Sequence, residues 1–215
     1  MRDKADYARK GIARGRSLVA CSVSDGIVLV AENAFRTLYK ISEIYDRIAF
    51  AGVGKYNEFE MLRVAGVRQA DLKGYSFARE DVNARALANA YAQTLGQVFT
   101  HEMKPYEVEI LLAEVHETAA EDELYHITYD GTVMDEEGCT VLGGQAEQIA
   151  EQLQTRFDQL ITSAEAIRLG ASVLSDQPEP LTGEQLEVAV LVRDRQRRAF
   201  KRFATAELDE ILSAT

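Results

Sequence analysis

The order of strand-like and helix-like segments along the 215 residues is the feature that most constrains the fold. β-rich runs occur in two blocks of four, a pair of helical patterns follows each block, and a last strand pair precedes a short helix. A parallel sheet would alternate strands and helices one by one, because parallel strands need a crossover connection. Grouped strands and paired helices instead predict antiparallel sheets with helices packed outside them. We therefore expect an α+β chain with four layers in the order αββα.

The individual segments follow from residue type and spacing. Runs rich in β-branched and aromatic residues predict strands, and apolar residues three and four positions apart predict helices. The clearest hairpin signal is Asp130-Gly131, a turn pair between two β-rich runs. The expected strands are 17–23, 27–31, 41–45, 47–53, 108–115, 124–129, 132–134, 140–142, 186–192 and 199–204. The expected helices are 1–14, 56–70, 81–99, 146–160, 164–174 and 206–212.

Charge and hydropathy exclude several classes of partner. The formal net charge of −11 opposes binding to nucleic acid or to an anionic membrane surface. No apolar run approaches the roughly 20 residues that span a bilayer, and no signal peptide is recognisable. We expect one cytoplasmic domain over residues 1–215. Two basic runs, 9–16 and 193–202, oppose the overall charge locally and are expected to be solvated faces.

The two cysteines do not indicate a metal or redox site. Cys21 and Cys139 each lie in an apolar run and form no Cys-x-x-Cys pair. This placement is typical of buried free thiols rather than of a disulfide framework. His116 and His126 show no spacing that predicts catalysis or metal binding, and we assign them no role. The sequence predicts neither a cofactor nor a metal.

The segment 6–15, with the sequence DYARKGIARG directly before a strand, resembles the opening helix of proteasome α subunits. Further matches occur at Tyr39-Lys40-Ile41, at 104–109, at Tyr129-Asp130-Gly131 and at Gly143-Gly144. The resemblance covers essentially the whole chain. The chain most resembles the actinobacterial type of α subunit, in which the loop that corresponds to the one between Glu32 and Lys40 is similarly short. It implies the αββα sandwich of the N-terminal-nucleophile hydrolases over 16–215, preceded by an α-type helix over 1–15.

The resemblance implies that this chain does not cut peptide bonds. Proteolytic subunits of the family expose an N-terminal threonine whose free amine acts as the base. The matching position here is Arg16, which has no nucleophilic oxygen and lies inside the chain. Glu32 and Lys40 match the supporting acid and lysine of the catalytic relatives, and Ser17 is the nearest hydroxyl. An active threonine- or serine-type N-terminal-nucleophile peptidase therefore stays as the alternative.

The resemblance also implies a docking pocket for an activator. In α subunits the lysine matching Lys40 lies between neighbours and receives the C-terminal carboxylate of the activator, a recurrent form of peptide recognition. Arg9 and Arg14 would form its basic wall, and Gly54 would lie where the backbone meets the incoming tail. Tyr7 matches the tyrosine that orders the open gate. The alternatives are an ordinary exposed lysine for Lys40 and plain helix packing for Tyr7.

The segment 100–104 matches the loop that narrows the axial channel of the family. His101, Glu102 and Met103 would then face the polypeptide that passes through it. The alternative for His101 is an ordinary solvated loop residue.

The implied partners are copies of the chain in a heptameric ring, β subunits, a ring-shaped ATPase or other activator that docks by its C-terminal tails, and unfolded protein substrates. Family members also carry a stretch before the first helix that fills the pore, and this sequence starts at the helix itself. A trimmed gate and a naturally short gate both stay open as explanations. A self-standing scaffold that binds no protease is the third alternative for the function.

Overall fold

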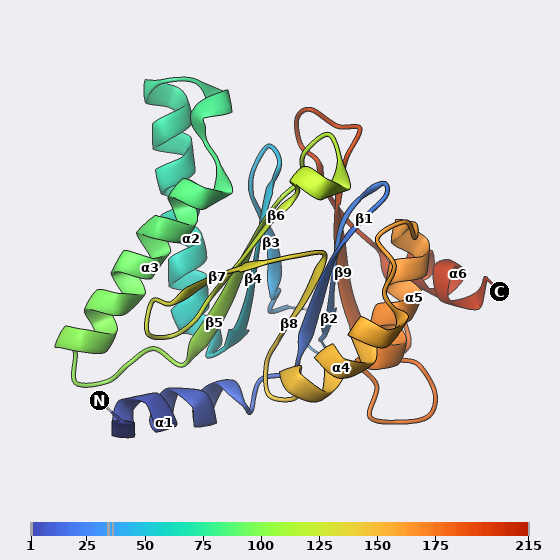
Figure 1. The fold of residues 1–215 in the computed structure, drawn as a ribbon, viewed down its shortest axis with the longest axis horizontal. Helices are drawn as coiled ribbons and strands as arrows, with labels where there is room; N and C mark the ends of the chain where they lie inside the picture. Colours follow the sequence, from blue (N-terminus) through green and yellow to red (C-terminus); the bar gives the residue numbers. More distant parts are fainter. Residues whose placement is uncertain (1, 34, 36, 215) are drawn as a thin grey trace.

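The computed structural model describes residues 2–33, 35 and 37–214, and in this part of the chain two antiparallel sheets lie face to face (Figure 1). The first sheet has the order β10 (Phe200–Arg202), β9 (Leu186–Val192), β2 (Gly26–Glu32), β1 (Leu18–Val23) and β8 (Cys139–Leu142). The second sheet has the order β3 (Ile41–Tyr45), β4 (Ile48–Gly54), β5 (Val108–Glu114), β6 (Glu123–Ile127) and β7 (Val133–Glu136). The sheets are antiparallel throughout, as the grouped strands predict.

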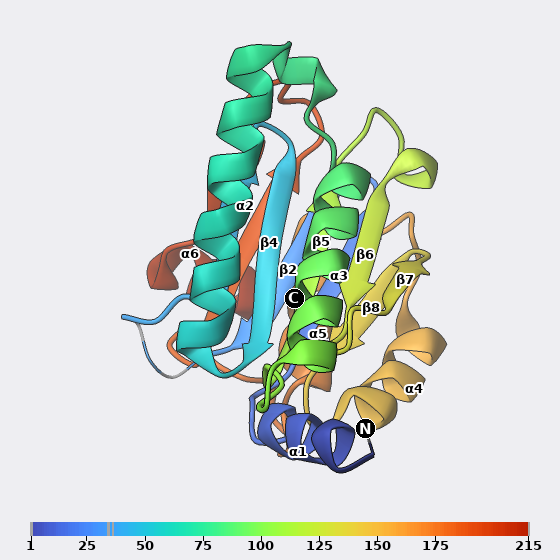
Figure 2. The same cartoon turned by 90° about the vertical axis from the view of Figure 1, so that its left-hand side faces the viewer.

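Pairs of helices cover the outer faces of the two sheets (Figures 1 and 2). Helices α2 (Tyr56–Ser76) and α3 (Ala84–His101) pack on the second sheet, and α4 (Ala146–Arg156) and α5 (Ser163–Val173) pack on the first. Helix α6 (Thr205–Ser213) lies beside α5, and α1 (Arg2–Ile12) crosses one end of the sandwich at the bottom of Figure 1. The predicted four-layer αββα architecture is confirmed.

Three apolar layers hold the sandwich together. The layer between the two sheets contains fully buried residues from both, among them Leu18, Leu29 and Leu111. Separate layers lie between each sheet and its helix pair. All six residues of β1 are buried, because this strand has neighbours on both sides and apolar layers on both faces. The start of β1 is therefore held rigidly, which positions the site described below.

Three predicted helix boundaries are wrong by three residues or more. Helix α2 continues to Ser76 rather than ending at residue 70. Local polar side chains explain the other two. Helix α4 ends at Arg156 rather than at residue 160, because the Asp158 carboxylate accepts a bond from the Leu160 amide (2.9 Å) and forms a turn there. Helix α3 begins at Ala84 rather than at residue 81, because the Asn83 side chain accepts the Ala86 amide (2.9 Å) as an N-cap.

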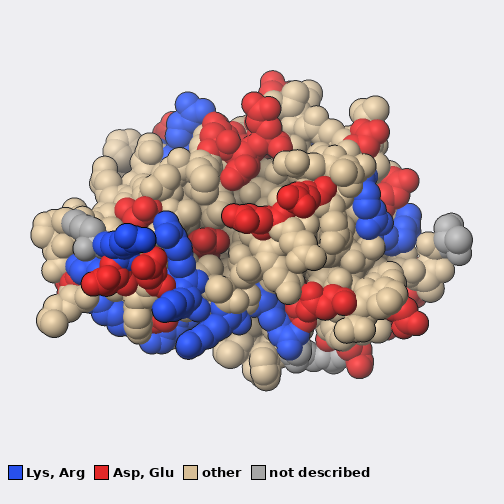
Figure 3. Space-filling model, turned by 60° about the horizontal axis from the view of Figure 1, so that its bottom comes forward, with Lys and Arg blue, Asp and Glu red and all other residues tan. Residues whose placement is uncertain are grey.

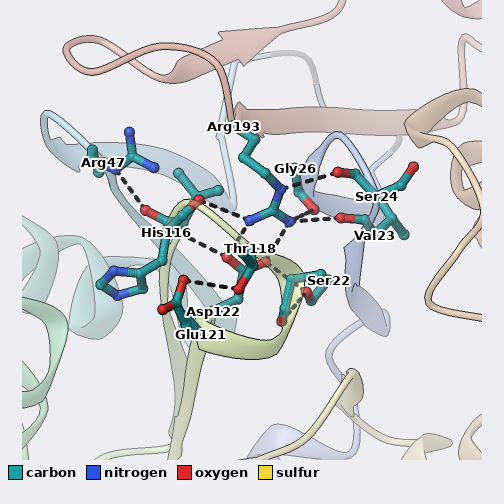
Figure 4. A network of polar contacts seen from close by, with 12 residues as sticks. Ser22, Val23, Ser24, Gly26, Arg47, His116, Thr118, Glu121, Asp122 and Arg193 are labelled. Atoms are coloured by element: carbon teal, nitrogen blue, oxygen red, sulfur yellow. Dashed lines mark hydrogen bonds and ion pairs between the residues drawn. The ribbon is translucent and has the colours of Figure 1, made fainter.

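The basic run 193–202 is not simply a solvated face, because the side chain of Arg193 is largely buried. Its guanidinium forms a bidentate pair with Asp122 (2.8 and 2.9 Å), and the exposed fractions of the two side chains are 9% and 1%. The same guanidinium donates to the Val23 and His116 carbonyl oxygens (Figure 4). The Ser22 hydroxyl donates to Asp122 (2.6 Å). We call Ser22, Asp122 and Arg193 the clamp; it connects the β1–β2 turn of the first sheet to the β5–β6 connection of the second.

No helix in the described part of the chain combines the length and the apolar character that are needed to cross a bilayer.

Candidate functional site

The predicted nucleophile position lies at the head of β1, and it holds an ion pair. The Arg16 guanidinium contacts the Glu32 carboxylate at the end of β2. The chain continues from Arg16 into α1, so the nitrogen of Arg16 is a peptide amide. Ser17 is buried, and its nitrogen is likewise part of a peptide bond. A hydroxyl next to a free amine, which an N-terminal nucleophile requires, is thus missing from both positions.

Lys40 lies beside this ion pair. Its ammonium donates to the Arg16 carbonyl oxygen (2.8 Å), and its backbone amide donates to the Glu187 carboxylate (2.9 Å). Burial lowers the pKa of Lys40 to about 8, the Glu187 charge acts in the opposite direction, and the Arg16 charge lowers it further. Most Lys40 side chains therefore carry a positive charge at neutral pH. The structure brings Arg16, Glu32 and Lys40 together, as the resemblance implies.

Glu187 on β9 is a member of this site that the sequence analysis missed. Its buried carboxylate accepts bonds from Asn33 Nδ2 (2.7 Å), the Lys40 and Ile41 amides (2.9 Å each) and Arg202 Nη1 (2.6 Å). It thus joins β9 of the first sheet to the start of β3 in the second. The sequence does show a charged residue between the apolar Leu186 and Val188. In a strand that alternates apolar and polar residues, however, such a residue is predicted to lie on the solvent-exposed face.

Arg14 lines a cavity of about 260 Å³ together with Arg16, Ser17 and Glu32. Neither Lys40 nor Arg9 is among the residues that line this cavity. The Arg9 guanidinium instead lies 5.9 Å from the centre of the Tyr129 ring. Within one chain the four residues predicted for the pocket therefore do not share a single cavity.

Gly54 allows the end of β4 to approach the residue before β5 closely. Its φ of +108° is a conformation that side chains rarely adopt, and a Cβ at this position would lie 2.0 Å from the Glu107 carbonyl oxygen. A Cβ on Gly15 would lie 3.0 Å from the Gly54 nitrogen. The backbone of Gly54 thus faces the turn that leads from α1 to Arg16, on the side predicted for the pocket.

Tyr7 lies on the outer surface of α1. Its side chain is 48% exposed, and the Lys104 ammonium lies 5.7 Å from the centre of its ring. Lys104 is held in turn by Glu58 (2.8 Å) and Glu107 (2.9 Å). Both interpretations of Tyr7, the tyrosine of an open gate and the packing of an amphipathic helix, therefore stand.

The loop predicted over 100–104 begins two residues later, and His101 is part of α3. The His101 ring contacts the Gln97 carbonyl oxygen (3.1 Å), and the Glu102 amide donates to the Val98 carbonyl oxygen (3.0 Å). These bonds extend the last helical turn through His101, and Pro105 is too distant to stop it earlier. Glu102 and Met103 do lie in the loop, and Met103 is 96% exposed.

The end of α3 is also tied to α1. The Lys4 ammonium donates to the carbonyl oxygens of Phe99 (3.1 Å) and Glu102 (2.6 Å). A cation at this place is favourable, because the last carbonyl groups of a helix carry partial negative charge. The loop that contains Glu102 and Met103 is therefore anchored to the first helix.

Positive charge gathers at the α1 end of the molecule despite the acidic composition. Figure 3 brings this end forward and shows Lys and Arg side chains concentrated on one side of it. Helix α1 and the turn after it carry six of them, Arg2, Lys4, Arg9, Lys10, Arg14 and Arg16. The Arg9 side chain is 68% exposed, which agrees with the solvated face predicted for the run 9–16. An acidic peptide end would be attracted to this surface.

Comparisons with known proteins agree on one family. Residues 12–191 match the family described as "Proteasome subunit". A protein of Acidothermus cellulolyticus named "Proteasome subunit alpha" is 57% identical, and the match covers 100% of this chain and 94% of that protein. Proteins with the same name from Kineococcus radiotolerans (55% identical, 100% and 94% covered) and Sanguibacter keddieii (57% identical, 100% and 86% covered) are similar to the same extent.

Proposed function

The chain belongs to the proteasome subunit family, and from this premise we propose that it is the non-catalytic α subunit of a bacterial 20S proteasome that acts in the cytoplasm. The observation that carries the proposal is the head of β1. Arg16 occupies the nucleophile position, is engaged with Glu32, and has a peptide nitrogen where a catalytic subunit needs a free amine. Peptide hydrolysis then belongs to the β subunits of the assembly.

The proposed assembly is a heptameric ring of identical copies that stacks on a ring of β subunits. Identical copies in head-to-tail contact form a closed ring when the rotation between neighbours allows closure. The outer helix pairs, α2 with α3 and α4 with α5, are the surfaces available for contact with neighbours and with the β ring. The ring narrows the entrance, so that unfolded chains pass and folded proteins do not. Glu102 and Met103, in the anchored loop after α3, face that passage.

Lys40 is the proposed docking point for the C-terminal carboxylate of a ring-shaped ATPase or other activator. Its ammonium is partly buried and uses one of its three N–H groups on the Arg16 carbonyl oxygen. A carboxylate that reaches it forms a charge-assisted bond in partly dry surroundings, where such a bond is stronger than in water. Arg14, on the cavity beside Arg16, adds positive charge to the approach. A neighbouring subunit completes the pocket, and Arg9 and Gly54 line its other parts.

Co-expression with a β subunit from an actinobacterial relative tests the assembly. We expect stacked rings in electron micrographs and peptide hydrolysis when both chains are present. Neither stacked rings nor hydrolysis should appear when one of the two chains is omitted. A chain that stays monomeric beside the β subunit would instead support a self-standing scaffold. Turnover of a fluorogenic peptide by the isolated chain, blocked by a trap for N-terminal nucleophiles, would support the peptidase alternative.

Lys40→Ala tests the docking point in the assembled particle. The variant should assemble normally and hydrolyse short peptides at the basal rate, while stimulation by an activator is lost. Lys201→Ala is the matched control, because Lys201 is also a partly buried lysine with a polar partner, Glu207 (2.8 Å), but lies on β10. Equal stimulation of the Lys40→Ala particle and the control particle would refute the docking role.

A further inference from the structure

Three side chains with metal-binding atoms meet at the end of the second sheet that lies away from Lys40. Glu114 ends β5, His116 follows two residues later, and Glu123 begins β6. Glu114 and Glu123 are direct partners in the antiparallel register. One ligand atom from each of the three side chains lies within 4.8 Å of the other two. The antiparallel pairing thus assembles residues that are nine positions apart in the sequence.

The negative charge of this cluster is incompletely balanced. Glu114 is buried, and the hydrogen bond to its carboxylate comes from the Ala84 amide at the start of α3 (2.6 Å). Among the described residues Glu114 forms no ion pair within 4.0 Å. Glu123 is paired with Arg85 (3.2 Å) and accepts the Tyr125 hydroxyl (2.9 Å). Two carboxylates directly opposite each other in a sheet repel, and a buried carboxylate without a cation is costly.

The imidazole of His116 has an unused nitrogen at the same place. Its Nε2 atom is buried and has no hydrogen-bond partner in the described part of the chain. The backbone of His116 belongs to the network around the clamp, since its amide donates to Asp122 (2.9 Å) and its carbonyl accepts from Arg193 (2.9 Å). Figure 4 shows the ring turned away from the Arg193–Asp122 pair. The backbone of His116 is thus fixed by the network around the clamp. Its ring points away from that network, and the buried Nε2 atom lacks a hydrogen-bond partner among the described residues.

The nearby arginines do not fill this role. Arg47 donates to the Val115 carbonyl oxygen (2.7 Å) and the Arg195 carbonyl oxygen (2.8 Å) rather than to Glu114. Among the described residues, Arg85 bonds to Glu123 and to Tyr125 and not to Glu114. Both guanidinium groups weaken the attraction of a further cation, so a bound ion must gain from direct coordination. Mg²⁺ and Ca²⁺ prefer oxygen ligands, so this requirement favours a transition-metal ion that binds imidazole strongly.

We propose that Glu114, His116 and Glu123 form a site for a divalent transition-metal ion of the Zn²⁺ class, which fixes the β5–β6 connection and the start of α3. Two carboxylate oxygens, one imidazole nitrogen and water complete a coordination shell that is usual for such ions. The site lies at the opposite end of β5 from Gly54, and it does not depend on the proposed function. It departs from the sequence-based expectation of no metal, because the spacing Glu-x-His lacks its third ligand until β6 pairs with β5.

Calorimetric titration of the full chain with Zn²⁺, after treatment with a chelator and removal of the chelator, tests the site. We expect one ion per chain and a rise in Tm on binding, because an ion that binds only the folded state stabilises it. His116→Asn and Glu123→Gln should each weaken binding roughly tenfold or more, in line with the cost of disturbing a metal site. Co²⁺ in place of Zn²⁺ should give a visible absorption band that His116→Asn abolishes.

His126→Asn is the matched control. His126 is also a buried histidine between two carboxylates, but Glu109 lies near its Nε2 (3.5 Å) and Glu136 near its Nδ1 (3.7 Å). Carboxylates at opposite ring nitrogens cannot share one ion with that ring. Absence of Zn²⁺ binding by the unmodified chain would overturn the proposal, as would equal weakening by His126→Asn and His116→Asn. If His116→Asn does not fold, Glu123→Gln, which keeps the side-chain shape, decides the question.

Discussion

The charged clusters at the two ends of strand β1 differ in how far they are buried. At the far end, Arg193 and Asp122 are almost fully buried, and the surrounding carbonyl groups and Ser22 complete their hydrogen bonds. At the head of β1, the Arg16 side chain is 51% exposed, and the neighbouring Lys40 ammonium contacts one carbonyl oxygen. The closed cluster connects loops of two sheets, whereas the open cluster keeps charge available to a partner. We therefore propose a structural role for the closed cluster and a binding role for the open one.

Removing the arginine of the clamp should have the largest effect on stability. Arg193→Met leaves the Asp122 carboxylate buried without its cation, and breaking a buried pair in this way costs about 3–5 kcal/mol. Urea unfolding monitored by circular dichroism gives the free energy of unfolding of both proteins. A loss below about 1 kcal/mol, the range of exposed ion pairs, would mean that the two ends of β1 do not differ as described.

The pH dependence of stability should reveal the burial of Lys40. Its pKa is about 8 in the folded chain and 10.5 for the unperturbed group, so between these values the unfolded state binds a proton that the folded state lacks. Stability from this group therefore rises as the pH increases from 8 to 10.5, by at most about 3.5 kcal/mol at about 1.4 kcal/mol per pKa unit. Lys40→Met should lack the rise, because it has no group to titrate.

The measurement is the free energy of unfolding of the unmodified chain and of Lys40→Met at pH 7.5 and at pH 10. The change with pH in one protein minus the change in the other isolates the contribution of Lys40 from other groups that titrate in this range. Parallel pH profiles for Lys40→Met and the unmodified chain would contradict the burial of a charged amine. Loss of the charge above about pH 8 should also weaken the docking of a carboxylate, because the bond requires the ammonium form.

Removing Arg16 should have the smallest effect. Its ion pair with Glu32 is partly exposed, and such pairs contribute about 0–1 kcal/mol. Arg79→Ala is a suitable control, since Arg79 is 47% exposed and pairs with Asp46. Both variants should unfold within about 1 kcal/mol of the unmodified chain, and Arg16→Ala should gain no peptidase activity. A loss of several kcal/mol specific to Arg16→Ala would show that the head of β1 is as closed as the clamp.

Much of the fold could be predicted from the sequence, because strand pairing and helix packing follow apolar periodicity that is visible locally. The Asp130-Gly131 hairpin and the antiparallel αββα layers are confirmed for this reason. The wrong boundaries lie where one polar side chain competes with the helix, as Asp158 does after α4. Such competition depends on side-chain direction, which residue spacing does not specify.

The polar clusters could be predicted only in part. Arg16, Glu32 and Lys40 were assigned through the family resemblance, and the structure brings them together. Glu187 and the Arg193–Asp122 pair were missed, since each bonds to residues far away in the sequence. A basic run with a buried member has the same local pattern as a fully solvated one. Only the packing of the two sheets distinguishes them.

The division of labour between this chain and its β partner is the central claim, and peptide hydrolysis by the assembled particle tests it most directly. The measurement compares particles that contain an unmodified β subunit with particles in which the N-terminal threonine of β is replaced by alanine. The account predicts full assembly in both cases and no hydrolysis of a fluorogenic peptide in the second. Residual hydrolysis that an N-terminal-nucleophile trap abolishes by modifying this chain would contradict it.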